Sequence, residues 1–196
     1  MKRADEKLLE AIAALAGAFK SLGVPAMVIG GIAVIARGVP RHTVDVDAAV
    51  WGERLELSHL FAVLAEHGIT GRVPDAEVFA RQRQVLLLRH DPSGQTLEIS
   101  LAWLPFEWDA LQRATIVDFG GVKIPVATPE DLVVYKAVAW RDRDKSDIER
   151  LLVLHGRSMN LERVRAIVKQ FSETLEEPER SAEFDTLVAR ALTPGS

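Results

Sequence analysis

Hydrophobic residues recur at helical spacing near the start of the chain. Residues 8–22 carry apolar side chains three or four positions apart, and the pattern stops at Gly23. A short apolar run over residues 26–29 then ends at two adjacent glycines, Gly30 and Gly31, and a second apolar segment follows. The pattern predicts an amphipathic helix, a strand, a glycine turn and another helix.

The next segment, residues 44–50, alternates in the manner of a half-buried strand. Asp45 and Asp47 fall on one face. The apolar residues Val44, Val46, Ala48 and Val50 fall on the other face. Both carboxylates are therefore expected to project from the same side of the strand.

Helix and strand patterns alternate through the middle of the chain. A helix is predicted around residues 55–66, and Gly68 ends it. Two strands, over residues 85–89 and 96–103, are joined by Asp-Pro-Ser-Gly, which is a turn sequence typical of a hairpin. A last strand is predicted over residues 122–126.

The last third of the chain reads as helix. Thr128, Pro129 and two acids form a strong start signal for a helix that reaches about residue 140. Further helices are predicted at about 145–154, after Asn160 as N-cap, and near 182–192. We therefore expect an α+β fold, in which a small mixed sheet is flanked by helices and followed by a C-terminal helical tail. Residues 1–127 would form the core, and residues 128–196 would pack on it to give a single compact domain.

Composition excludes several classes of protein. The chain has 196 residues, of which 48% are hydrophobic and 27% charged, and it has no cysteine, so disulfides, thiolate zinc sites and thiol nucleophiles are absent. The first ten residues lack a secretory signal, and the longest apolar stretch, residues 24–36, is too short to cross a bilayer. We expect a soluble, cytoplasmic protein with no membrane segment.

Charge is unevenly distributed along the chain. The net charge of −4 argues against a general nucleic-acid binder, yet residues 136–169 contain nine bases against five acids. This segment would either meet phosphates or form a solvated helical surface.

The pattern that indicates chemistry is the glycine turn followed by the paired aspartates. Glycines at the start of a helix allow a phosphate to approach the backbone, and the amides there favour negative charge. Two aspartates at i and i+2 supply the oxygen ligands that Mg²⁺ prefers. Glu98, an acid between apolar residues on a neighbouring predicted strand, fits a third metal ligand, or else it lies on the solvated face of the sheet.

Three motifs carry a resemblance to a known superfamily. Residues 28–31 (Val-Ile-Gly-Gly), 41–47 (Arg-His-Thr-Val-Asp-Val-Asp) and 97–99 (Leu-Glu-Ile) resemble the motifs of the polymerase-β-like minimal nucleotidyltransferases. Within that superfamily, residues 128–132 (Thr-Pro-Glu-Asp-Leu) and 136–147 are similar to the AbiEii-type toxin nucleotidyltransferases and related proteins. The likeness covers about residues 27–152.

The resemblance implies roles for particular residues. Asp45, Asp47 and Glu98 would hold Mg²⁺ or Mn²⁺, and Gly30 and Gly31 would hold the triphosphate of an NTP substrate. From the helical tail, Lys136, Asp144 and Asp147 would complete the catalytic and nucleotide-binding site.

The side chains between the glycine turn and the paired aspartates are open to more than one interpretation. Arg41 would either contact a phosphate or pair with a neighbouring acid, and Thr43 would orient Asp45. His42 is interpreted as a surface residue. Trp103, Trp108 and Trp140 are interpreted as packing residues, with Trp140 also placed to touch a nucleobase.

The implied activity is transfer of a nucleoside monophosphate from an NTP to a hydroxyl acceptor. By resemblance, the acceptor would be tRNA or another RNA, and a toxin-like member would have an antitoxin partner. One alternative is an inactive nucleotide-binding or protein-interaction module on the same fold. Another is a phosphatase or sugar transferase that uses Asp-x-Asp, although a phosphatase would carry Thr or Val where this chain has Ala49.

Overall fold

The chain folds into two compact units. Its structure is a computed structural model that describes residues 2–53 and 55–193. One unit extends up to Ala36 and resumes from His42 to Ala127, and the other consists of Arg37–Arg41 and the chain from Thr128 onward. The outermost residues of the two predicted parts, 1 and 194–196, lie outside the described residues. That the helical part packs on the core as a single compact domain stays a prediction.

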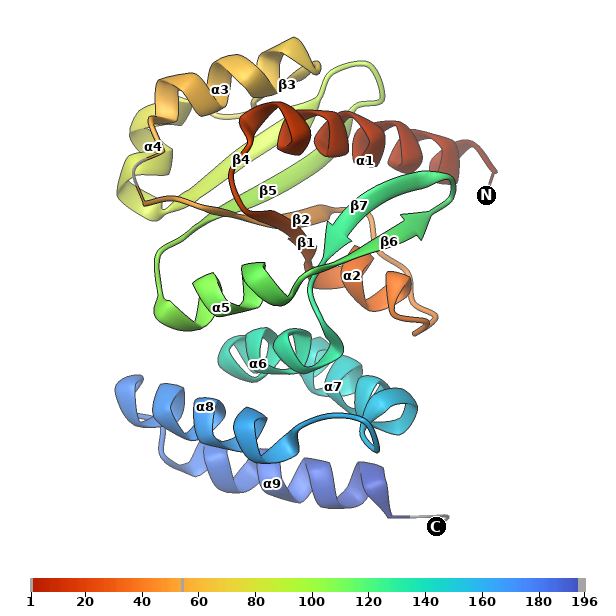
Figure 1. Cartoon of the computed structure of the whole chain (residues 1–196), viewed down its shortest axis with the longest axis vertical. Coiled ribbons are helices and arrows are strands. Elements are labelled where there is room, and N and C mark those ends of the chain that lie inside the picture. Colours follow the sequence, from red (N-terminus) through yellow and green to blue (C-terminus); the bar gives the residue numbers. More distant parts are fainter. Residues whose placement is uncertain (1, 54, 194–196) are drawn as a thin grey trace. The chain divides into compact units, whose positions relative to one another are not determined.

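A mixed sheet forms the centre of the first unit (Figure 1). Among the described residues, seven strands join in the order β3-β4-β5-β2-β1-β7-β6. The strands are β1 (Ala26–Ile29), β2 (Val46–Trp51), β3 (Ile69–Gly71), β4 (Val85–His90), β5 (Gln95–Ala102), β6 (Thr115–Phe119) and β7 (Val122–Val126). The β2/β5 and β1/β7 pairs are parallel and the others are antiparallel. The predicted α+β class with a small mixed sheet is therefore confirmed.

Helices cover this sheet. They are α1 (Lys2–Leu22), α2 (Gly30–Ala36), α3 (Leu57–Glu66), α4 (Ala76–Arg83) and α5 (Pro105–Arg113). Helix α1 packs on β7, β2 and β5 and lies beside α3, and α2 and α5 both contact β2. Ile12 and Leu15 of α1 are fully buried, because helical spacing places them on the face that meets the sheet. Strand β2 is thus held between its sheet neighbours and two helices.

The second unit is helical. Its helices are α6 (Pro129–Ala139), α7 (Asp142–His155), α8 (Leu161–Thr174) and α9 (Glu179–Leu192). Two of the predicted caps are present: the Thr128 side chain accepts a hydrogen bond from the Asp131 amide, and the Asn160 side chain accepts one from the Arg163 amide. In the part of the chain that the structure describes, no helix is both long enough and apolar enough to cross a membrane.

Some elements differ from the sequence-based expectation. Strands β3 and β6 and helices α4 and α5 were not predicted, and β3 and β6 are the two edges of the sheet. An edge strand buries little, as the 63% exposure of Ile116 in β6 shows, so its hydrophobic pattern is weak. The prediction that Val44 belongs to the buried face of a strand was wrong, since β2 begins at Val46 and Val44 is 69% exposed.

Candidate functional site

The turn between β1 and α2 strongly favours glycine. Gly30 has a φ of +62°, in the left-handed region that disfavours side chains. A Cβ added at this position would lie 1.9 Å from Oδ2 of Asp47. The next amide, that of Gly31, donates to the same carboxylate oxygen over 3.4 Å. The turn and the aspartate are therefore in direct contact.

The sheet register explains why Asp47 reaches the turn. Strands β1 and β2 are antiparallel, and Asp47 is paired with Ile29, the last residue before the glycines. The side chain is half-buried, and the neighbouring Val46 and Ala48 are buried. This contact matches the arrangement expected from the sequence.

Asp45 lies just before β2 and is exposed. Its Oδ1 accepts a 2.5 Å hydrogen bond from the Thr96 hydroxyl. Thr43, which was predicted to orient Asp45, donates to the backbone carbonyl of Asp45 over 3.4 Å. The Asp45 carboxylate is thus bonded to Thr96, a residue that the sequence analysis did not identify. Its position two residues before Glu98 on the same predicted strand was a signal that could have identified it.

Glu98 is the strand neighbour of Asp47. Strands β2 and β5 are parallel, and their register pairs Asp47 with Glu98. Thr96 and Glu98 are two residues apart on β5, so they project from the same face of the sheet, and the hydrogen bond from Thr96 brings the Asp45 carboxylate to that face as well. The structure therefore places the three predicted carboxylates on the same face of the sheet, near the start of β2.

Glu98 also has a cationic partner. Nη2 of Arg72 lies 2.7 Å from its Oε1, and the two side chains are 35% and 44% exposed. Arg72 directly follows β3, an edge strand that the sequence pattern did not reveal. No sequence signal placed this arginine beside the acids.

These carboxylates fit a divalent cation in the chemistry of their ligand atoms. Asp45, Asp47 and Glu98 offer hard oxygen ligands, and the missing Cβ of Gly30 lets the Asp47 carboxylate lie against the start of α2. Among the described residues, however, no three His, Cys, Asp or Glu side chains converge closely enough to hold a metal ion. Asp47 lies against the glycine turn, Asp45 is bonded to Thr96, and Glu98 is paired with Arg72.

A second cluster of charged residues is buried within the helical unit. Nζ of Lys136 lies 2.7 Å from Oδ2 of Asp147 and 3.3 Å from Oδ1 of Asp144. The three residues are only 6%, 3% and 2% exposed, respectively. Arg41 also pairs with Asp147, which agrees with the interpretation that Arg41 meets a neighbouring acid.

The charges in this cluster compensate one another. Burial opposes ionisation of Asp144, but the hydrogen bond from Arg141 and the charges of Lys136 and Arg141 together hold the pKa of Asp144 below its usual value. The segment that carries Arg41 is tied to the same helices, because His155 donates to the Arg37 carbonyl over 2.8 Å and Arg150 donates to the Pro40 carbonyl over 3.3 Å. The cluster is thus an integral part of the second unit.

The predicted site residues fall into two sets, one in each unit. The first unit contains Gly30, Gly31, Thr43, Asp45, Asp47 and Glu98, and the second contains Arg41, Lys136, Asp144 and Asp147. Their roles in binding nucleotide or metal stay predictions. His42 is exposed, and Trp140 donates to Glu183 over 2.9 Å and has the Lys145 ammonium 4.9 Å from its ring centroid.

Several solved structures share this fold. The antibiotic-resistance factor ANT(2'')-Ia in solution aligns with a TM-score of 0.57 and 18% identity over 91% of this chain and 98% of its own. A crystal structure of ANT(2")-Ia in complex with adenylyl-2"-tobramycin aligns with a TM-score of 0.55 and 18% identity, over 87% of this chain and 98% of its own. An antigenic nucleotidyltransferase-like protein from Paracoccidioides brasiliensis aligns with a TM-score of 0.51 and 20% identity, over 88% of this chain and 92% of its own. At these identities the likeness establishes the fold.

Sequence comparison establishes the family. No curated protein matches the chain. Residues 6–191 match the family described as "Nucleotidyltransferase of unknown function (DUF6036)", so the match spans nearly the whole sequence. The chain therefore belongs to this family and is a nucleotidyltransferase.

Proposed function

We propose that this protein transfers a nucleoside monophosphate from an NTP to a hydroxyl group, with release of pyrophosphate. The observation that carries the proposal is the contact between the Asp47 carboxylate and the Gly30-Gly31 turn, where a Cβ at Gly30 would lie 1.9 Å from Oδ2. Glu98 is the partner of Asp47 in the register of β2 and β5, and Asp45 is bonded to Thr96, two residues before Glu98. Family membership supports the same reaction class.

In the first unit, the acids and the glycines would have different roles. Asp45, Asp47 and Glu98 would hold Mg²⁺ or Mn²⁺, which when bound supplies positive charge against the triphosphate and the leaving pyrophosphate. Gly30 and Gly31 would admit the triphosphate next to the backbone, because neither has a Cβ. The acceptor oxygen forms a bond to the α-phosphorus, and the bond from that phosphorus to the bridging oxygen of the β-phosphate breaks.

The charged cluster of the second unit would keep the helices of that unit in place. Lys136 was predicted to complete the nucleotide-binding site, yet the residue is 6% exposed and its ammonium has two carboxylate partners. Any contact of Lys136 with a phosphate would require Asp144 or Asp147 to give up that ammonium. We therefore assign Lys136, with Arg41, to positioning of α6 and α7, and the paired aspartates of the first unit to catalysis.

The acceptor is the finer part of the proposal. An RNA acceptor was implied by the resemblance, and the excess of bases between residues 136 and 169 agreed with it. Several of these bases, however, are paired with acids in the structure. Such pairs include Lys136–Asp147, Arg141–Asp144, Arg163–Asp131 and Arg165–Asp185. The surface that would attract RNA is therefore less positive than the sequence count indicates.

A small hydroxyl-bearing molecule is the second candidate for the acceptor. It is favoured by the shared fold with ANT(2")-Ia, whose crystal structure contains adenylyl-2"-tobramycin. A toxin-like role with an antitoxin partner, and a particular closeness to the AbiEii type, stay predictions from the sequence motifs.

Substitution of the paired aspartates tests the proposal. Asp45→Asn and Asp47→Asn should each lower Mg²⁺-dependent transfer of label from the four α-labelled NTPs at least about 100-fold, with total RNA or small polyols as acceptors. Thermal stability should stay nearly unchanged or rise, because one of several clustered negative charges is removed. Asp109→Asn, at an exposed position of α5, is the matched control and should keep full activity.

Full transfer activity in both aspartate variants would contradict the assignment. Loss of activity in Asp109→Asn as well would show that the effect is not specific to this site. Label found in RNA or in a polyol would identify the class of acceptor.

A further inference from the structure

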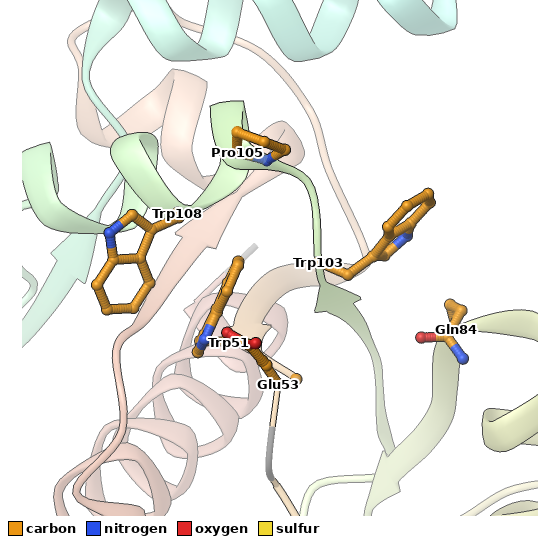
Figure 2. Close-up of a pocket in the computed structure, with 7 residues that line it drawn as sticks. Trp51, Glu53, Gln84, Trp103, Pro105 and Trp108 are labelled. Atoms are coloured by element: carbon orange, nitrogen blue, oxygen red, sulfur yellow. The ribbon is translucent and has the colours of Figure 1, made fainter.

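A cavity lies at the carboxyl ends of β2 and β5 (Figure 2), whereas Asp47 lies near the start of β2. Its volume is about 470 Å³, within the range of small-molecule sites. The described residues that line it are Trp51, Gly52, Glu53, Gln84, Trp103, Pro105 and Trp108. Glu98 and Trp103 are five residues apart, which is about 16 Å along an extended chain. A ligand in this cavity would therefore be separate from the phosphates at the glycine turn.

Three of the four tryptophans in the chain line this cavity. Trp51 and Trp108 lie against each other, with ring centroids 4.9 Å apart and planes at 58°. Trp103 stands on another side of the space and is 63% exposed, which contradicts its interpretation as a packing residue. Exposed tryptophans in a concave surface are typical of binding sites.

The position of Trp103 is fixed by the start of α5. The amides of Trp103 and Leu104 both donate to Oε2 of Glu107, each over 3.0 Å, and Pro105 begins the helix. These bonds hold the segment after β5 in one conformation. The backbone, and not packing of the indole itself, therefore keeps Trp103 at the cavity.

The polar groups of the cavity are suited to a cation. Glu53 is the charged side chain among the described lining residues. Gln84 donates its Nε2 to the Arg81 carbonyl over 3.0 Å, which leaves its Oε1 as an acceptor, and Figure 2 shows that oxygen on the side facing Glu53. The amide of Gly52 is already used, because it donates to the Ala102 carbonyl over 2.9 Å.

We propose that this cavity binds a small organic cation, an ammonium or guanidinium group on an apolar frame. Indole faces attract cations, and Glu53 and Gln84 supply acceptors for N–H donors. The apolar frame of the ligand would occupy the remaining space between the tryptophans. The site does not depend on the nucleotide chemistry at the other end of β2 and β5.

Tryptophan fluorescence of the full-length protein provides the test. In a Trp140→Phe background the remaining tryptophans all line the cavity. Benzylammonium is expected to change their emission in a saturable manner, and the neutral isostere benzyl alcohol should bind at least about 10-fold more weakly. The anion benzoate should give no saturable response.

Variants locate the site. Trp103→Ala should weaken benzylammonium binding about 10-fold and should fold normally, since the side chain is largely exposed. Glu53→Gln should weaken it about 3- to 10-fold, whereas Glu56→Gln, an exposed acid outside the cavity, should have no effect. Asp47→Asn should leave binding unchanged, which separates this inference from the proposed transfer activity.

Equal affinity for benzylammonium and benzyl alcohol would overturn the proposal, because the cavity would then recognise only apolar surface. Absence of a saturable response to benzylammonium would overturn it too. Equal effects of Glu53→Gln and Glu56→Gln would show that the general charge of this region, and not the cavity, attracts the probe.

Discussion

Replacement of Gly30 by alanine tests the geometry on which the proposed site rests. A side chain at φ +62° costs about 1–2 kcal/mol. The new Cβ would also lie 1.9 Å from Oδ2 and 2.6 Å from Cγ of Asp47, so the carboxylate must move. Overpacking of this kind costs about 1–3 kcal/mol, and the sum predicts a loss of about 2–5 kcal/mol in the free energy of unfolding.

Gly23 offers a matched control within the same unit. Its φ is +64°, but a Cβ there would meet no atom within 4 Å. Gly23→Ala should therefore show only the conformational cost, about 1–2 kcal/mol. The difference between the two variants, about 1–3 kcal/mol, isolates the contact with Asp47.

Urea denaturation followed by circular dichroism measures both free energies of unfolding. In an Asp47→Ala background, the cost of Gly30→Ala should fall, because Oδ2 and Cγ are gone and only the Cβ contact at 2.6 Å remains. Mg²⁺-dependent transfer should be lost in Gly30→Ala and kept in Gly23→Ala. Equal destabilisation by the two alanines would refute the reasoning, since Asp47 could not then lie against the turn.

Two further predictions concern charge. Lys136→Met should lower the free energy of unfolding in urea by about 3–5 kcal/mol, because it leaves Asp144 and Asp147 buried together. Arg72→Ala removes a half-exposed pair and should cost less than about 1 kcal/mol. Similar losses in the two variants would contradict the assignment of Lys136 to a structural role. Because the pKa of Asp144 is lowered in the folded state, its ionised form stabilises the protein above the unfolded pKa of about 3.9, and this contribution disappears as pH falls through the folded pKa. The melting temperature of Asp144→Asn should therefore fall less than that of the wild type between pH 5 and pH 3, and parallel curves would be the contrary result.

Elements with strong local signals were predicted closely. Strand β1 ends at Ile29, directly before Gly30, and β7 has the predicted bounds, because each is a short strand pattern that ends at a clear stop. Helix α6 begins after Thr128, as its cap and its proline indicated. In these cases the residues that fix the boundary are adjacent in the sequence to the element itself.

Elements at the edges of the sheet had no comparable signal. Strand β3 has three residues, which is too short for alternation to be visible. Helix α5 depends on Glu107, which accepts the Trp103 and Leu104 amides, and on a pattern too short to stand out. The exposure of Trp103 likewise follows from the position of α5 and not from the composition around it.

The candidate site shows the same division between local and long-range information. Spacing along the chain was enough to place Asp47 near the glycine turn, because β2 returns antiparallel beside β1 after α2. The partners of the acids come from distant segments: Thr96 is 51 residues from Asp45 in sequence, and Arg72 is 26 residues from Glu98.

Three neighbouring carboxylates repel one another, and Arg72 places a positive charge among them. A divalent cation bound to Glu98 would have to compete with this guanidinium, so in the proposed site Arg72 would weaken the binding of Mg²⁺.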